Sequence, residues 1–128
     1  MLGPGSWFTS VLPHLLVPDL RDAICGSAAR RVVALNLVPQ PGETAGFSPE
    51  QHLEVLAAHA PELTLDVVLG DAAAVDDPQR LASVAKTFGA ELVLAPLAAA
   101  DGTPRHDPGL LAAAYGGLLR GGKIPPWL

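Results

Sequence analysis

The sequence predicts an α/β fold in which a Rossmann-like wound parallel sheet carries helices on both faces. Short, continuous apolar runs rich in Val and Leu alternate with segments of helical periodicity along the whole chain. The apolar residues are mainly Ala, Leu and Val, and aromatic residues make up only 5% of the 128 residues. Strands that are apolar on both faces are typical of parallel sheets buried between helices. Alternation of strand and helix is typical of wound sheets.

Three strands are predicted from the apolar runs, at Arg31–Val38, Leu65–Leu69 and Glu91–Leu94. A polar residue, Asn36, stands inside the first of them. Since a helical segment separates each strand from the next, we expect all three strands to lie parallel in one sheet.

Four helices are predicted from apolar residues spaced at i, i+3, i+4 and i+7. Their apolar sets are Phe8, Val11, Leu12 and Leu15; Leu53, Leu56, Ala57 and Ala60; Leu81, Val84, Ala85 and Phe88; and Leu111, Ala114, Tyr115 and Leu118. A shorter helix is predicted over Pro18–Gly26, because Pro suits a first helical position and Gly a helix end. Ser48–Gln51 has the pattern of a capping box, and Asp77-Pro78 and Asp107-Pro108 indicate two further helix starts.

Composition and charge exclude several classes of protein. The chain is 49% hydrophobic with a net charge of −5, from 8 basic against 13 acidic residues, and it has no basic stripe for a nucleic acid. Its one cysteine, Cys25, cannot form a disulfide within the chain and suits a reducing compartment. No apolar run reaches the length of a membrane span, roughly 20 residues, and the start lacks the features of a signal peptide. We therefore expect a cytoplasmic protein without a nucleic-acid or membrane partner.

The start of the chain indicates an incomplete fold. Met1-Leu2 leads directly into a glycine turn, which in a wound sheet should follow a strand, and two residues are too few for a strand. We expect residues 1–119 to be the C-terminal part of an α/β domain whose N-terminal half is missing, and residues 120–128 to be a non-helical tail. A sheet truncated in this way exposes an unpaired edge that recruits other chains, so a homo-oligomer is expected.

The first candidate site is the segment Gly3–Ser10. Glycines let the backbone turn tightly and approach a ligand closely, and the N-terminus of the following helix offers unpaired N–H groups and a positive dipole end to an anion. An ordinary strand-to-helix turn, with Ser6 as the helix cap, explains the pattern equally well, because it matches neither the dinucleotide fingerprint nor the Walker loop. The predicted phosphate-binding residues are Gly3, Gly5, Ser6, Thr9 and Ser10.

The second candidate site is Asn36–Phe47, the loop after the first predicted strand. Ligands bind in loops at the carboxyl ends of parallel strands, and this loop presents amide, carboxylate and hydroxyl groups together. The predicted ligand-binding residues are Asn36, Gln40, Glu43 and Thr44. Asn36 stands inside an apolar strand, where its side chain needs a partner. The less favoured alternative is that Asn36 simply pins a neighbouring loop through backbone hydrogen bonds.

The remaining polar residues indicate no metal site and no catalytic residue. His52 and His59 lie two turns apart on one predicted helix, without a carboxylate or cysteine at zinc-like spacing, and we expect them on a solvated face. His106-Asp107 together with Ser6 would suggest a hydrolase triad, but Ser6 lacks the Gly-x-Ser-x-Gly context of such a nucleophile. Asp107 is explained as a helix cap, and Cys25 as a packing residue.

Both candidate segments resemble the signatures of a known family. Gly3–Pro18 is similar to the glycine-proline-glycine-serine segment of the gluconeogenesis factors, bacterial members of the CofD-like superfamily of 2-phospho-L-lactate transferase. Asn36–Phe47 resembles the second signature of that family at the expected spacing, and the similarity extends from residue 2 to about residue 119. Thr44–Phe47 together with His106–Pro108 looks most like the actinobacterial branch.

The resemblance implies a Rossmann-like protein that binds a uridine-diphosphate (UDP) sugar, or another dinucleotide-like ligand, with no certain cofactor besides that ligand. It also implies a regulatory role in growth on gluconeogenic carbon, in cell shape and in cell-wall synthesis. The alternative is a transferase that moves a phosphate-linked group, as 2-phospho-L-lactate transferase does, for which Glu43 is the one carboxylate in a candidate loop. A structural fragment without activity is a third hypothesis. The family's N-terminal half is absent here, and His14 replaces an expected asparagine.

Overall fold

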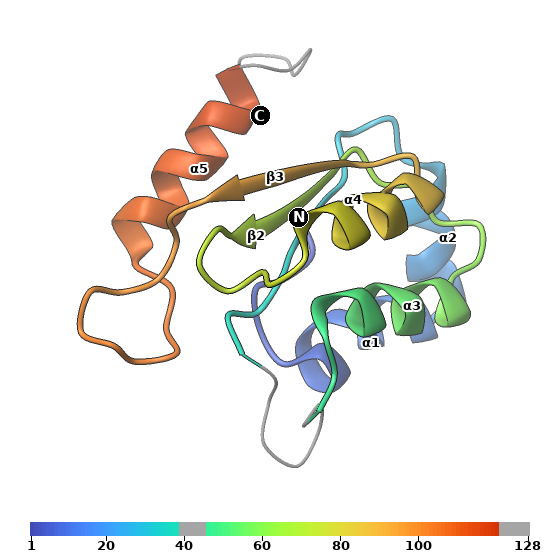
Figure 1. The fold of residues 1–128 in the computed structure, drawn as a ribbon. Coiled ribbons are helices and arrows are strands. Elements are labelled where there is room, and N and C mark those ends of the chain that lie inside the picture. Colours follow the sequence, from blue (N-terminus) through green and yellow to red (C-terminus); the bar gives the residue numbers. More distant parts are fainter. Residues whose placement is uncertain (39–45, 121–128) are drawn as a thin grey trace.

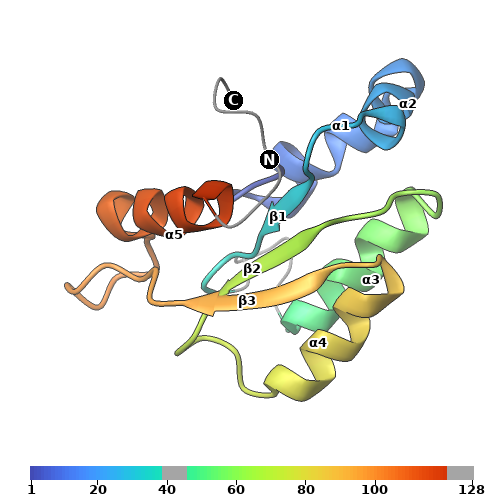
Figure 2. The same ribbon diagram turned by 90° about the horizontal axis from the view of Figure 1, so that it is seen from above.

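The computed structural model of this chain describes residues 1–38 and 46–120. Strands β1 (Val32–Ala34), β2 (Val67–Asp71) and β3 (Glu91–Ala95) form a parallel sheet in the order β1-β2-β3, with Val33 opposite Val68. Helices cover both faces of the sheet: α3 and α4 lie together on one face, and α5 lies on the other (Figures 1 and 2). The predicted α/β class, with a wound parallel sheet between helices, is confirmed.

Four helices begin where the sequence predicts them. They are α2 (Pro18–Gly26), α3 (Pro49–His59), α4 (Pro78–Thr87) and α5 (Pro108–Arg120). The capping box of α3 is formed, because Ser48 Oγ accepts from the Gln51 amide at 3.2 Å and Gln51 Oε1 accepts from the Ser48 amide at 2.8 Å. Asp77 and Asp107 cap α4 and α5 by accepting from the amides three residues later, at 3.0 and 2.9 Å. The starts of α3, α4 and α5 depend on these local hydrogen bonds, which is why the sequence predicts them well, whereas α2 begins at a Pro without a side-chain cap.

The strands differ from the predicted runs at their ends. β1 is much shorter than the predicted Arg31–Val38, although the Leu35 amide still donates to a carbonyl of β2 at 2.9 Å. Beyond that point the side chain of Asn36 binds the backbone of Gly5, so the chain leaves the sheet there. β2 starts two residues later than predicted and, like β3, extends further at its carboxyl end.

The residues ahead of the glycine turn occupy a strand position beside β1. Leu2 pairs in parallel with Val33: its amide donates to Val32 O at 2.8 Å, and its carbonyl accepts from the Ala34 amide at 2.9 Å. The turn at Gly3 therefore follows β-paired backbone, as in a wound sheet. Leu2 is also buried, so this short pairing belongs to the core.

The first predicted helix is less regular than its periodicity suggests. The structure has a π-helical turn, η1 (Trp7–Val11), followed by a short α-helix, α1 (Pro13–Leu16). The Leu12 amide donates to Trp7 O, five residues earlier, at 2.8 Å. This wide turn changes which side chains face inward, so that Trp7 is fully buried and Phe8 is 40% exposed. The prediction that Phe8 lies on the buried face is therefore wrong.

Side chains from the two faces of the sheet form two apolar clusters. The larger contains Trp7 and Val33 together with residues of α3 and α4, and the smaller contains Val32 and Val67, packed against α5. Neighbouring residues of β1 thus point to opposite clusters, as expected of a strand that is buried on both faces. Cys25 is half-buried against the larger cluster, which confirms its predicted packing role.

The C-terminal helix α5 extends to Arg120, one residue into the segment 120–128 that the sequence predicts as a non-helical tail. Residues 121–128 lie outside the described part of the chain. Within the described ranges, no helix combines the length and the apolarity needed to cross a membrane.

Candidate functional site

The glycine turn between Leu2 and η1 lies directly against the carboxyl end of β1. Gly3 has φ +71°, and a Cβ atom there would lie 2.7 Å from Ala34 O, so no other residue fits without moving the strand. Gly5 has φ +151°, and a Cβ atom there would lie 3.0 Å from the Cβ atom of Ser10. The fold alone therefore explains why both of these positions in the predicted phosphate site are glycine, without any contact to a ligand.

Asn36 binds the glycine turn through both ends of its side-chain amide. The Gly5 amide donates to Asn36 Oδ1 at 3.1 Å, and Asn36 Nδ2 donates to Gly5 O at 2.8 Å. This pairing is the alternative that the sequence leaves open, in which Asn36 pins a neighbouring loop. The side-chain amide has a further N–H and a further lone pair, so a ligand role for Asn36 stays a prediction. The two bonds join the two predicted sites.

The hydroxyl residues of the turn differ in exposure. Ser6 is half-buried at the N-cap position of η1, but its side chain makes no capping hydrogen bond to that turn. Thr9 and Ser10 are exposed. Because a π-helical turn of 5 residues and a helix of 4 replace the regular helix expected here, the dipole that they offer an anion is weaker than predicted. The phosphate-binding roles of these residues stay predictions.

A cavity of about 270 Å³ lies where the two predicted sites meet. It is at the carboxyl end of the sheet, the end at which wound sheets bind ligands. Gly5 and Asn36 line it, whereas Gly3, Ser6, Thr9 and Ser10 do not. The lining comes from the glycine turn, the residues after β1 and the loop between β3 and α5, and it consists of Pro4, Gly5, Asn36, Leu37, Val38, Pro104, Arg105 and His106.

Arg105 and His106 line the cavity, although sequence patterns did not mark them as ligand-binding. Arg105 is exposed and lines the cavity. It is the one Lys or Arg among residues 96–107, and a single basic residue in this loop is the sequence signal that could have indicated a role for it. His106 Nε2 is buried and has no hydrogen-bond partner among the described residues. A guanidinium at the cavity suits a ligand that carries negative charge.

A buried carboxylate holds the loop between β3 and α5 in place. Asp71, at the carboxyl end of β2, is 5% exposed, and it accepts from the Leu97, Ala98 and Ala73 amides at 2.7, 3.2 and 3.0 Å. Ala98 and His106 then pair as an antiparallel bridge. Three amide donors are a sufficient reason for a buried carboxylate. Sequence patterns alone do not single out Asp71, because an acidic residue after an apolar run is ordinary at a strand end.

Three of the predicted ligand-binding residues, Gln40, Glu43 and Thr44, lie outside the described residues. Among the residues that the structure does describe, no group of three or more His, Cys, Asp or Glu side chains could hold a metal ion. The described site therefore consists of the glycine turn, Asn36 and the loop between β3 and α5.

His52 is buried, so the prediction of a solvated face is wrong for this residue. It is 5% exposed, whereas His59, two turns further along α3, is exposed as predicted. The physical reason is a contact between segments 45 residues apart. The side chain of Trp7 in η1 packs against the ring of His52, and Trp7 Nε1 donates to His52 O at 3.0 Å. The periodicity of α3 alone carries no information about that contact.

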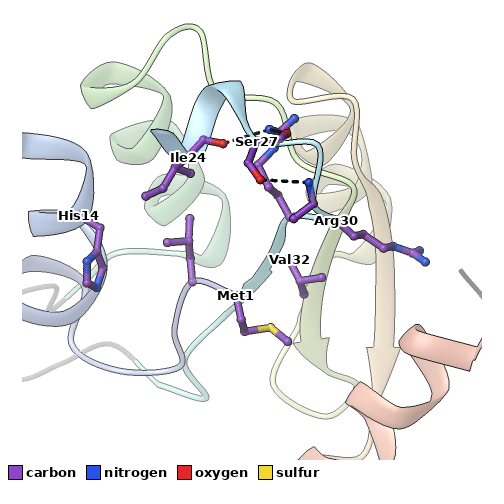
Figure 3. Close-up of a pocket in the computed structure, with 9 residues that line it drawn as sticks. Met1, His14, Ile24, Ser27, Arg30 and Val32 are labelled. Carbon is purple, nitrogen blue, oxygen red and sulfur yellow. Dashed lines mark hydrogen bonds between the residues drawn. The ribbon is translucent and has the colours of Figure 1, made fainter. Parts of the chain in front are cut away.

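A second cavity, of about 250 Å³, lies at the opposite, amino end of β1 (Figure 3). Met1 and Val32 contribute to its lining, His14 and Ile24 lie to one side, and the side chain of Arg30 points away to the other (Figure 3). Arg30 Nη1 donates to a carbonyl of α5 at 3.2 Å. None of the predicted ligand-binding residues in the described ranges lines this cavity. His14, which stands where the family resemblance leads us to expect asparagine, therefore lies at the end of the sheet away from the candidate site.

Residues 1–93 of the chain match the family of 2-phospho-L-lactate transferase CofD. Because the match covers more than half of the chain, this protein is a member of the CofD family. Its curated relatives there are gluconeogenesis factors: the "Putative gluconeogenesis factor" of Mycobacterium tuberculosis is 49% identical over 132 residues, and that of Mycobacterium leprae is 48% identical over 126 residues. The resemblance drawn from the sequence, including the actinobacterial branch, is confirmed.

These matches cover nearly all of the chain but a minor part of each relative. The alignment spans 98% of this chain and 38% of the M. tuberculosis protein, and 96% of this chain and 35% of the M. leprae protein. A crystal structure of a UPF0052 family member from Bacillus halodurans has a TM-score of 0.73 and 28% sequence identity, covering 88% of this chain and 41% of that one. The chain thus spans less than half the length of these relatives.

Proposed function

We propose that this chain forms part of a regulatory protein that binds a UDP-sugar at the carboxyl end of its sheet. The observation that carries the proposal is the double hydrogen bond between Gly5 and Asn36, which joins both predicted ligand sites beside a cavity. A turn of bare backbone next to an arginine suits a diphosphate group. The family match supports the same ligand class, since 2-phospho-L-lactate is itself a phosphate-bearing compound.

In this proposal the diphosphate lies over the glycine turn. Arg105 neutralises part of its charge, which matters in a chain of net charge −5. His106 lines the cavity beside Arg105. The phosphates contact the backbone of Gly3 and Gly5 and the hydroxyl groups of Ser6, Thr9 and Ser10, of which Gly5 lines the cavity itself. The nucleoside or the sugar contacts Asn36, Gln40, Glu43 and Thr44.

The cavity is smaller than a complete ligand requires. Pockets that enclose drug-sized ligands measure roughly 300–1,000 Å³, and this one measures about 270 Å³. The relatives contain much more chain than the matched part, which is 38% of the M. tuberculosis protein. We therefore propose that the N-terminal half of the CofD fold is the partner that completes the pocket.

A transferase that moves a phosphate-linked group is the alternative, and the name of the matching family favours it. The regulatory role is supported by Asp71, the buried carboxylate that ends β2. Three backbone amides donate to it, so it has a structural role in the fold and is not a candidate for transfer chemistry. Glu43 remains the candidate carboxylate for transfer chemistry. Incubation with a radiolabelled UDP-sugar separates the two functions: a binding protein retains the intact label, whereas a transferase converts it to a product.

The cellular part of the proposal concerns a cytoplasmic regulator of growth on gluconeogenic carbon, cell shape and cell-wall synthesis. The names of the relatives support a connection with gluconeogenesis. Deletion of the gene should slow growth on a gluconeogenic carbon source while sparing growth on a sugar, and the wild-type gene should restore it. Equal growth of the deletion strain on both carbon sources would contradict this role.

A further inference from the structure

The ring of His52 connects the two predicted ligand sites. Trp7, which directly follows Ser6, packs edge-on against it with 5.1 Å between ring centroids and 87° between ring planes. Phe47, which ends the second predicted segment, packs against it with 5.8 Å between centroids and 76° between planes. Such edge-to-face pairs are favourable arrangements for aromatic rings. One side chain of α3 thus contacts an aromatic neighbour of each site.

Hydrogen bonds fix the ring of His52 in place. Nδ1 lies 2.8 Å from Ser48 O, and because a carbonyl oxygen can only accept, Nδ1 carries a proton and donates it to this bond. The backbone of the same residue is held as well, since Trp7 Nε1 donates to His52 O at 3.0 Å in a buried position. Ring and backbone of His52 are therefore both tied to their surroundings.

The other ring nitrogen of His52 indicates that this histidine is not a simple core filler. His52 Nε2 is buried and has no hydrogen-bond partner among the residues that the structure describes. A buried polar atom without a partner costs free energy that an apolar side chain would avoid. Beyond apolar contact, this histidine contributes the ring orientation that is set by its bond to Ser48.

We propose that His52 is a positioning residue of the nucleotide-sugar site, which holds the glycine turn against the segment leading into α3. It acts through Trp7, one residue beyond Ser6, while Asn36 holds the same turn at Gly5 from the side of β1. The turn is then fixed from two sides. The link to a ligand rests on the proposed function, whereas the positioning of the turn does not.

Amide hydrogen exchange in the free chain tests the positioning. His52→Asn keeps a donor close to the position of Nδ1 but removes the ring, and it should speed exchange at the Gly5 amide roughly three- to tenfold. The Val68 amide in β2 should keep its rate. The matched control is His59→Asn, the same substitution at an exposed position of the same helix, which should leave both amides unchanged. An unchanged rate at Gly5 in His52→Asn, or equal acceleration at Val68, would overturn the proposal.

A titration with UDP, the part common to all UDP-sugars, then tests the link to the ligand. Ser6→Ala and His52→Asn are compared singly and together, with the dissociation constant taken from NMR shifts. Because both changes act on one turn, the double variant should lose at least threefold less affinity than the product of the two single losses. Losses that simply multiply would overturn the link. The titration is performed on the chain together with the N-terminal half that is proposed to complete the pocket. If this wild-type protein does not respond to UDP, the proposed function fails, and the exchange experiment still decides whether His52 positions the turn.

Discussion

The polar atoms and glycines beside the cavity belong to the fold as much as to any ligand. Gly3 is required by its contact with Ala34 O, and the side chain of Asn36 is paired with the backbone of Gly5. Residue types alone predicted that these positions matter, but they could not separate a structural reason from a ligand contact. The sequence did not predict a role for Arg105, because its loop reaches the cavity only through the tertiary fold.

Gly3→Ala should destabilise the fold. The added Cβ atom would lie 2.7 Å from Ala34 O at a φ of +71°, so the free energy of unfolding should fall by about 1–3 kcal/mol in urea denaturation. Gly26→Ala is the matched control, because a Cβ atom there meets nothing within 4 Å. Similar losses at both positions would show that the contact with Ala34 does not control the turn.

Among the secondary-structure elements, those with local start signals were predicted best. The capping residues Ser48, Asp77 and Asp107 fix three helix starts through hydrogen bonds within one turn. Predictions failed where distant segments meet. The π-helical turn buries Trp7 and exposes Phe8, and the ring of Trp7 in turn helps to bury His52. Periodicity describes one helix at a time, and it cannot report a contact made by another element.

Asp77→Ala should weaken α4 at its start. The Asp77 carboxylate accepts from the Arg80 amide at 3.0 Å, and loss of a cap of this kind typically costs about 0.5–2 kcal/mol of stability. Asp76→Ala removes the same charge from the neighbouring residue, which is not the cap, and should change stability by less than about 0.5 kcal/mol. Chemical denaturation of both variants measures the difference, and equal effects would argue against the cap.

At the scale of the whole molecule, α5 differs from the other helices. It lies alone over its face of the sheet, and residues 108–119 contain no charged side chain (Figure 2). Helices that are apolar all round are normally buried. Here part of the outer face is exposed, at Gly109, Leu110, Ala112, Ala113 and Gly117. This apolar outer face adds to the expectation, based on the sheet edge, that the chain associates with other polypeptides.

The isolated chain should sediment as dimers or larger species. Ala113→Glu places a charge on the exposed face of α5 and should shift the distribution toward monomers, because charged residues are depleted in the buried core of interfaces. Analytical ultracentrifugation of both proteins measures the change. A monodisperse wild-type monomer with a cooperative melt at high temperature would show that the chain is a self-sufficient domain.

The claim that a nucleotide sugar binds at the carboxyl end of the sheet is tested most directly by an NMR titration with UDP, performed on this chain together with the N-terminal half that is proposed to complete the pocket. Saturable shifts are expected at the amides of Gly5, Ser6 and Arg105. Arg105→Ala or Ser6→Ala should weaken binding roughly ten- to hundredfold, as expected for one hydrogen bond to a charged group. Absence of saturable shifts, or shifts confined to Met1 and Val32 at the second cavity, would contradict the claim.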